Sequence, residues 1–178
     1  MHEASYTECQ KCPIGRYSTT RIFYRGVIPA DILIVGEAPT DTDLVLSKPF
    51  SGPPGRLLTK ITNEAFSGEE YDELALCMTY TILCAPCEPP SFKMRQPSEN
   101  EIRNCSSRLQ NFYDIVSPKH VVAVGRIAEK AVKRLRTAND ANPPEYTLIP
   151  TLTSILNQGE QGTLDYKRAV SALQAINI

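Results

Sequence analysis

The chain has 178 residues, of which 42% are apolar and 22% are charged, and these proportions are typical of a soluble globular protein. No run is long and apolar enough to cross a membrane, and the acidic, cysteine-containing N-terminus lacks the pattern of a secretory signal, so we expect a cytoplasmic protein. The net charge of −1 excludes a protein that coats nucleic acid by bulk electrostatic attraction, although a few local groups can still grip phosphates.

Strand and helix patterns alternate along the chain. The first expected strand, Ala30–Gly36, is a continuous apolar run that ends in glycine. It is followed by an expected helix over Pro54–Phe66, whose apolar residues fall on one stripe. A second strand over Leu76–Leu83 leads to a helix over Ser98–Val116, which opens with a Ser-x-x-Glu capping box.

The second half of the chain repeats this alternation. A strand over His120–Gly125 precedes a helix over Ile127–Leu135, and a weaker strand over Tyr146–Pro150 precedes a closing helix over Asp165–Ile176. The pattern predicts an α/β protein with three layers (α/β/α), a central four-stranded parallel sheet and a single domain spanning residues 1–178. In such folds the ligand site lies beyond the carboxyl ends of the strands.

Six cysteines are many for a compartment in which disulfides seldom persist. One lies in an apolar segment and is expected to be a small buried hydrophobe, namely Cys77. The other five suit ligation of a metal or a cluster, and they are Cys9, Cys12, Cys84, Cys87 and Cys105.

The segment after the first strand carries two features of a binding site. Gly36-Glu37-Ala38-Pro39 places a glutamate at the mouth of the sheet, directly after a glycine that permits a tight turn. Further on, Pro49-Phe50-Ser51-Gly52 places an aromatic ring in a turn just before a helix whose N-terminal amides can receive a phosphate. Each feature alone is also compatible with ordinary turn chemistry.

Taken together, these segments resemble the signature of the family 4 uracil-DNA glycosylases, in which Gly-Glu-Ala-Pro is followed by Pro-Phe-x-Gly-x-x-Gly-x-Leu-Leu. The resemblance extends over residues 9 to 135 in order and spacing. It includes Cys9-Gln10-Lys11-Cys12-Pro13, residues 79–86, Arg95-Gln96-Pro97, Glu101-Ile102 with Cys105, and residues 118–125.

The resemblance implies a structural [4Fe–4S] cluster held by four thiolates. Cys9, Cys12 and Cys105 match its ligands directly, and Cys84 is the favoured fourth ligand because Cys84-Ala85-Pro86 matches a family motif. Cys87 is the rival for that position. A four-cysteine zinc site fits the same spacing, so the choice of an iron–sulfur cluster depends on the family.

The resemblance also implies a site for a base that is flipped out of DNA. Phe50 would stack on the base, with Ala38, Tyr80 and Thr153 around it, and Glu37 and Asp43 would place the attacking water or stabilise the sugar cation. Groups expected to approach DNA phosphates are Ser51, Gly52, Gly125 and Ser154.

Two positions depart from the family pattern. Tyr80 stands where the family has an asparagine that reads the uracil edge, and its side chain does not offer the same paired donor and acceptor. Thr151-Leu152-Thr153-Ser154 stands where the family has a loop with a catalytic histidine. The histidines of this chain, His2 and His120, do not match that position.

The leading interpretation is therefore a monomeric DNA repair enzyme that hydrolyses the N-glycosidic bond of uracil or a related modified pyrimidine in DNA. We expect its substrate to be single-stranded or to carry an extruded base. Two alternatives stay open: a protein that binds DNA or a modified base without excision, and an enzyme that transfers a group onto a modified thymine.

Overall fold

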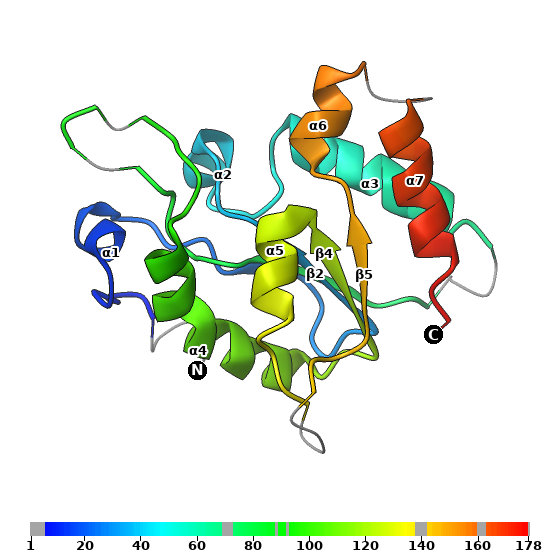
Figure 1. The fold of residues 1–178 in the computed structure, drawn as a ribbon, viewed down its shortest axis with the longest axis horizontal. Helices are drawn as coiled ribbons and strands as arrows, with labels where there is room; N and C mark the ends of the chain where they lie inside the picture. Colours follow the sequence, from blue (N-terminus) through cyan, green and yellow to red (C-terminus); the bar gives the residue numbers. More distant parts are fainter. Residues whose placement is uncertain are drawn as a thin grey trace.

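The structure is a computed structural model that describes residues 6–68, 73–87, 89–91, 93–137, 142–159 and 163–177. Its centre is a five-stranded sheet in the order β1-β3-β2-β4-β5 (Figure 1). The strands are β1 (Tyr24–Gly26), β2 (Ile32–Gly36), β3 (Leu76–Tyr80), β4 (His120–Val124) and β5 (Tyr146–Ile149).

Strands β2 to β5 run parallel to one another, and they are the four strands that the sequence predicts. The fifth, β1, pairs antiparallel with β3 at the edge of the sheet. It was not expected because it has only three residues, Tyr-Arg-Gly, and therefore no apolar run. The α/β class and the parallel sheet are thus confirmed, with one short edge strand added.

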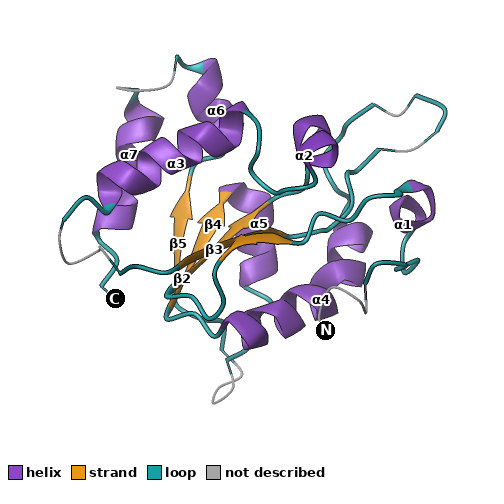
Figure 2. Cartoon of the chain, turned by 180° about the vertical axis from the view of Figure 1, so that it is seen from behind, coloured by secondary structure: helices purple, strands orange, loops and turns teal. Residues whose placement is uncertain are grey.

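Helices cover both faces of this sheet (Figure 2). On one face lie α3 (Pro53–Ala65), α6 (Leu152–Asn157) and α7 (Leu164–Gln174), and on the other lie α4 (Glu99–Val116) and α5 (Gly125–Val132). The side chains of β2 alternate between these two layers, because Ile32 and Ile34 belong to one core and Leu33 and Val35 to the other.

Two further short helices lie outside these layers, α1 (Pro13–Tyr17) and α2 (Asp41–Leu46). Like α6, they have six residues or fewer, which is too short for a helical period to be visible in the sequence. The capping box at the start of α4 is present as predicted, since Ser98 and Glu101 bond to each other's backbone amides. No helix in the described ranges has the length and hydropathy of a membrane span.

The register of the sheet brings four strand ends together. Gly36 pairs with Tyr80, and Val124 pairs with Ile149, at the carboxyl ends of the parallel strands. The chain continues from β2 toward α3 on one face and from β4 into α5 on the other face. Adjacent strands whose connections diverge in this way leave a crevice between their ends, which is the expected ligand site of such a sheet.

Candidate functional site

A cleft of about 890 Å³ opens at the carboxyl ends of β2, β3 and β4. Its base includes Gly36, Tyr80 and Val124, each the last residue of a strand. Its walls come from the segment after β2, from residues 94–96 before α4, and from residues 151–158, which include α6. Its volume lies within the usual range of about 300–1,000 Å³ for ligand sites.

Glu37 lines this cleft directly after β2. Its side chain is half-buried, and burial raises the pKa of its carboxyl group. It forms no hydrogen bond or ion pair with any other part of the chain that the structure describes. A carboxylate in this state is available to a bound water or ligand, because no neighbour commits its oxygens.

Phe50 and Tyr80 form a stacked pair at the edge of the cleft. Their ring centroids are 4.6 Å apart, with an angle of 29° between the ring planes. Phe50 is 4% exposed and Tyr80 is 5% exposed, so both border the cleft with very little surface. A Cβ on Gly36 would lie 2.6 Å from the Phe50 ring and 2.8 Å from the Tyr80 ring, and only glycine therefore fits at the end of β2.

The hydroxyl group of Tyr80 holds this pair of rings in place through two hydrogen bonds. It donates to Oδ2 of Asp43 at 2.9 Å and accepts from the backbone N–H of Phe50 at 2.9 Å. Phe50 has a φ of 52°, a left-handed conformation that costs free energy for a bulky residue and needs support from its surroundings. Burial, and then the negative charge of Asp43, raise the pKa of Tyr80, so the phenol stays neutral.

Asp43 lies behind the cleft, not in it. Its carboxyl group is 1% exposed, and it accepts bonds from the N–H and hydroxyl of Thr40 at 2.8 and 2.7 Å. Its other oxygen accepts from the N–H of Ser51 at 2.8 Å. Together with Tyr80, these donors occupy both oxygens, so Asp43 joins α2, the Phe50 turn and β3 into one unit.

Six residues expected at the site line the cleft: Glu37, Ala38, Phe50, Tyr80, Thr153 and Ser154. Ser51 and Gly52 do not line it, and the Ser51 amide that was expected to face a phosphate is bonded to Asp43. Gly125 borders a neighbouring cavity of about 510 Å³, which shares Thr151 with the cleft. Its φ of 84° and the 2.4 Å approach of Thr151 Cγ2 to a Cβ at this position require glycine there.

The sequence did not indicate the polar wall that α6 adds. Asn157 and Gln158 line the cleft from this helix together with Thr153 and Ser154. The side chains of Ser154 and Gln158 are hydrogen-bonded to each other and to Asp165, and these bonds connect α6 to the start of α7. One residue could have indicated the start of α6 in the sequence: Thr151 caps this helix by accepting a hydrogen bond from the N–H of Ser154.

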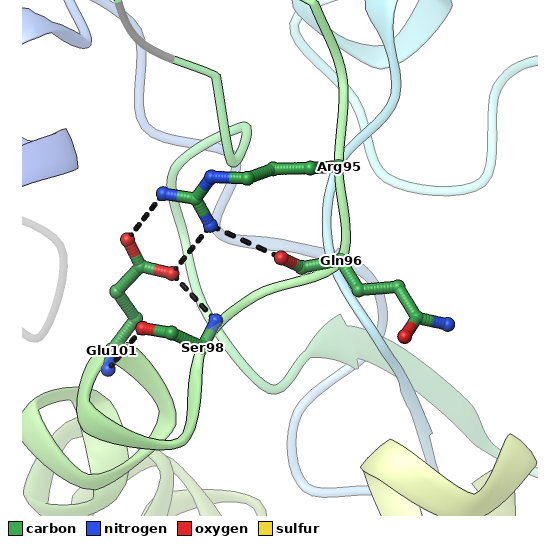
Figure 3. A network of polar contacts seen from close by, with 4 residues as sticks. All are labelled: Arg95, Gln96, Ser98 and Glu101. Carbon is green, nitrogen blue, oxygen red and sulfur yellow. Dashed lines mark hydrogen bonds and ion pairs between the residues drawn. The ribbon is translucent and has the colours of Figure 1, made fainter.

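The opposite wall is fixed by a network at the start of α4 (Figure 3). Arg95 bonds both carboxylate oxygens of Glu101, at 2.7 and 2.9 Å, and donates to the carbonyl of Gln96. Glu101 in turn accepts from the N–H of Ser98 at 2.7 Å. These bonds hold the pKa of Glu101 below its usual range, with the bond to Arg95 as the largest cause. Residues 95 and 96 are thereby held in place against the cleft.

All six cysteines carry free thiols. Burial raises the pKa of Cys12, and the neighbouring Cys105, Glu101 and Cys9 raise it further. Burial also raises the pKa of Cys84 to about 11; Arg21 opposes this effect, while Cys105 and Cys12 add to it. Cys12 and Cys105 therefore lie near Cys84, and Cys9 lies near Cys12, although no three Cys, His, Asp or Glu side chains of the described residues have metal-binding geometry.

The remaining two cysteines are Cys87 and Cys77. Cys87 borders a small cavity of about 220 Å³ with Tyr17 and Leu44. Cys77 is fully buried in β3, and burial raises its pKa to about 12, as expected for a small core residue. Cys84 thus lies close enough to Cys12 and Cys105 for their charges to interact, and the choice between Cys84 and Cys87 as the fourth ligand stays a prediction.

Two arginines accompany the four grouped thiols. Arg108 is 1% exposed, and it donates to the hydroxyl of Thr79 and to the carbonyls of Tyr80 and Thr81. Burial lowers its pKa, and the nearby Cys105 and Cys84 oppose that change. The Nε atoms of Arg108 and Arg21 are buried and have no hydrogen-bond partner. Arg108 is a buried cation without a carboxylate partner among the described residues, and thiolates at Cys105 and Cys84 would place negative charge beside it.

No histidine of the described residues reaches the cleft. His120 is 6% exposed at the start of β4, where its Nε2 shares a hydrogen bond with Thr147 Oγ1 at 2.9 Å. Burial lowers its pKa, so it is a neutral structural residue. His2 lies outside the described residues.

Comparison with known proteins places this geometry in a family. The model of the "Uracil DNA glycosylase superfamily" matches residues 23–173. The "Type-4 uracil-DNA glycosylase" of Sulfurisphaera tokodaii is 34% identical over 124 residues, which are 70% of this chain and 53% of that protein. The protein of the same description from Saccharolobus solfataricus is 30% identical over 119 residues, covering 67% and 51%. The chain thus spans about half the length of these relatives.

A solved structure shares the fold. The solution NMR structure of a protein from Methanosarcina acetivorans, provisionally described as a uracil DNA glycosylase, superposes with a TM-score of 0.60. The match covers 87% of this chain and 96% of the other, at 12% sequence identity. At that identity the similarity concerns the three-layer architecture alone.

Proposed function

Because the chain belongs to the uracil DNA glycosylase superfamily, we propose that it binds DNA with one base extruded and hydrolyses the N-glycosidic bond of uracil or a related modified pyrimidine. The observation that carries this proposal is Glu37, a half-buried carboxylate without a partner among the described residues, in a cleft at the carboxyl ends of the parallel strands.

The chemistry assigned to Glu37 follows from its position. Water adds its oxygen to the sugar carbon C1′ while the bond from C1′ to the base nitrogen breaks, and the bonding electron pair leaves with the base. The ionised carboxylate of Glu37 orients that water, accepts its proton and stabilises positive charge on the sugar. The raised pKa of Glu37 improves its ability to accept this proton near neutral pH.

Asp43 takes a different role in this proposal from the one that the sequence suggested. Because its oxygens are occupied by Thr40, Ser51 and Tyr80, we assign it as a positioning residue for the Phe50 turn. On the side of the leaving base, Thr153 and Ser154 supply neutral hydroxyl groups where the family has a histidine. The absence of such a charge stabiliser typically costs a factor of about 10² to 10³ in rate, so we expect slow turnover.

The proposal includes a [4Fe–4S] cluster held by Cys9, Cys12, Cys84 and Cys105. The donor set fits, because thiolates bring negative charge to the buried guanidinium group of Arg108 and to the partly buried Arg21. When bound, such a cluster supplies cross-links and charge, joining the N-terminal segment, the segment after β3 and α4. Zinc is the runner-up, because four cysteine thiolates are also a common ligand set for that metal.

A single-turnover excision assay tests the proposal. Single-stranded oligonucleotides with one deoxyuridine, or with one 5-substituted deoxyuridine, are incubated with excess protein and treated with alkali, and strand breaks are counted. We expect slow excision that the variant Glu37→Gln reduces by a factor of about 10² to 10⁴. No strand break with any of these bases, or equal excision by wild type and variant, would overturn the proposal.

A second function, binding of DNA without excision, is supported by the closed state of the Phe50–Tyr80 pair. A base can stack on a ring only where one face is free, and Phe50 is 4% exposed. Tight binding of uracil-containing DNA without release of base in the same assay would select this alternative.

A further inference from the structure

If the proposed function holds, the stacked rings of Phe50 and Tyr80 control how an extruded base reaches the site. Stacking a base on Phe50 requires a free ring face, whereas Tyr80 stacks on this ring at 4.6 Å and the ring is 4% exposed. Within the structure as described, the base position on Phe50 is therefore closed by the chain's own side chain.

Tyr80 is held in that closed position by more than ring contact. Its hydroxyl donates to the buried carboxylate of Asp43 and accepts from the N–H of Phe50, both at 2.9 Å. A hydrogen bond to an ionised carboxylate in a buried site is among the stronger ones in proteins. Asp43 itself is fixed by the N–H groups of Thr40 and Ser51. The anchor of Tyr80 is thus rigid.

Movement of Tyr80 is nevertheless possible in one direction. Its ring borders the cleft of about 890 Å³, which has room for a phenol ring beside a pyrimidine. On the sheet side the Tyr80 ring packs against Gly36 so closely that a Cβ built on this glycine would lie 2.8 Å from the ring. The ring therefore has no space to move toward the sheet. Opening therefore means rotation of the Tyr80 side chain into the cleft.

We infer that Tyr80 is a gate on the base site: stacked on Phe50 and fastened by Asp43, it must swing into the cleft before an extruded base can stack on Phe50. The gate selects against bases that gain too little from the site to displace it. It acts as a specificity-determining residue, and it takes part in the proposed reaction only through access to Phe50.

The test compares two single-stranded oligonucleotides that differ at one nucleotide. One carries a 2′-fluorinated deoxyuridine, whose glycosidic bond resists hydrolysis, and the other carries a tetrahydrofuran analogue of an abasic site. The abasic strand has no base and does not require the gate to open. The ratio of the two dissociation constants, Kd for uracil over Kd for the abasic analogue, therefore measures the cost of opening.

For the wild type we expect this ratio to be about 10 or more, since breaking the two hydrogen bonds of the Tyr80 hydroxyl contributes roughly tenfold in total. Tyr80→Phe keeps the ring and removes both hydrogen bonds, and its ratio should fall severalfold. Tyr80→Ala also frees the ring face, and its ratio should fall to about 1 or below. Tyr24→Phe is the matched control, because Tyr24 packs against Phe112 in the other core, and its ratio should equal that of the wild type.

A wild-type ratio near 1, or a folded Tyr80→Ala variant with an unchanged ratio, would overturn the gate. Thermal unfolding checks the fold of each variant, and if Tyr80→Ala does not fold, the ratio of Tyr80→Phe decides. The ratio of dissociation constants does not depend on excision. If neither the wild type nor any variant cleaves the strand, hydrolysis is refuted and the gate is not. If the wild type excises the base efficiently and its ratio is near 1, only the gate is refuted.

Discussion

Replacement of Asp43 by alanine removes the acceptor of four hydrogen bonds at a position that is 1% exposed. The hydroxyl groups of Thr40 and Tyr80 can rotate toward other acceptors, but the backbone N–H groups of Thr40 and Ser51 cannot. Each bond to a charged group contributes about 1.5–3 kcal/mol, and two are lost without replacement. We therefore expect a loss of about 3–6 kcal/mol in the free energy of unfolding, or roughly 6–24 °C in Tm.

Urea unfolding followed by circular dichroism measures this loss. Asp43→Asn retains one acceptor oxygen, and it should lose about 2 kcal/mol because its NH₂ group meets a backbone donor. Asp41→Ala is the matched control: Asp41 is an exposed acid in the first turn of the same helix, and its loss should stay within about 0.5 kcal/mol. If Asp43→Ala were as stable as this control and lost only activity, the assignment of Asp43 as a positioning residue would be refuted in favour of a direct catalytic role.

Three further outcomes follow from the same geometry. Burial raises the pKa of Glu37, so the charged form of this side chain destabilises the folded state at neutral pH. The variant Glu37→Gln should therefore keep or raise Tm at pH 7. This gain in Tm should vanish as the pH falls through the raised pKa of Glu37. Arg95 lowers the pKa of Glu101, so the stability from this pair is present above the ordinary pKa and is lost in acid; Glu101→Gln should cost about 1–3 kcal/mol at pH 7 in urea unfolding, and the difference should shrink as the pH falls. Cys84→Ser should abolish the iron content and brown colour of the purified protein, whereas Cys87→Ser should retain both, and the opposite result would identify Cys87 as the ligand.

The sequence predicted most of the fold because its signals are local. Short runs rich in apolar residues marked the four parallel strands, the last one more weakly, and the capping box of Ser98 and Glu101 marked the start of α4. The segments Gly36–Pro39 and Pro49–Gly52 indicated the place of the site, because strand ends and the turns after them are determined by neighbouring residues. Helix α6 was missed, since six residues carry no visible period, and with it the polar wall from Asn157 and Gln158.

Only the tertiary structure decided which site residues contact one another. Asp43 and Tyr80 are 37 positions apart, and the hydrogen bond between them holds an expected catalytic carboxylate outside the cleft and an expected base-binding ring against Phe50. Likewise, the sequence leaves Cys84 and Cys87, three positions apart, as rivals, and only the folded chain brings Cys84 near Cys12 and Cys105. A residue type limits the chemistry that a position can perform. Its partners, which come from distant parts of the chain, determine whether its oxygens, ring faces or sulfur are free to perform it.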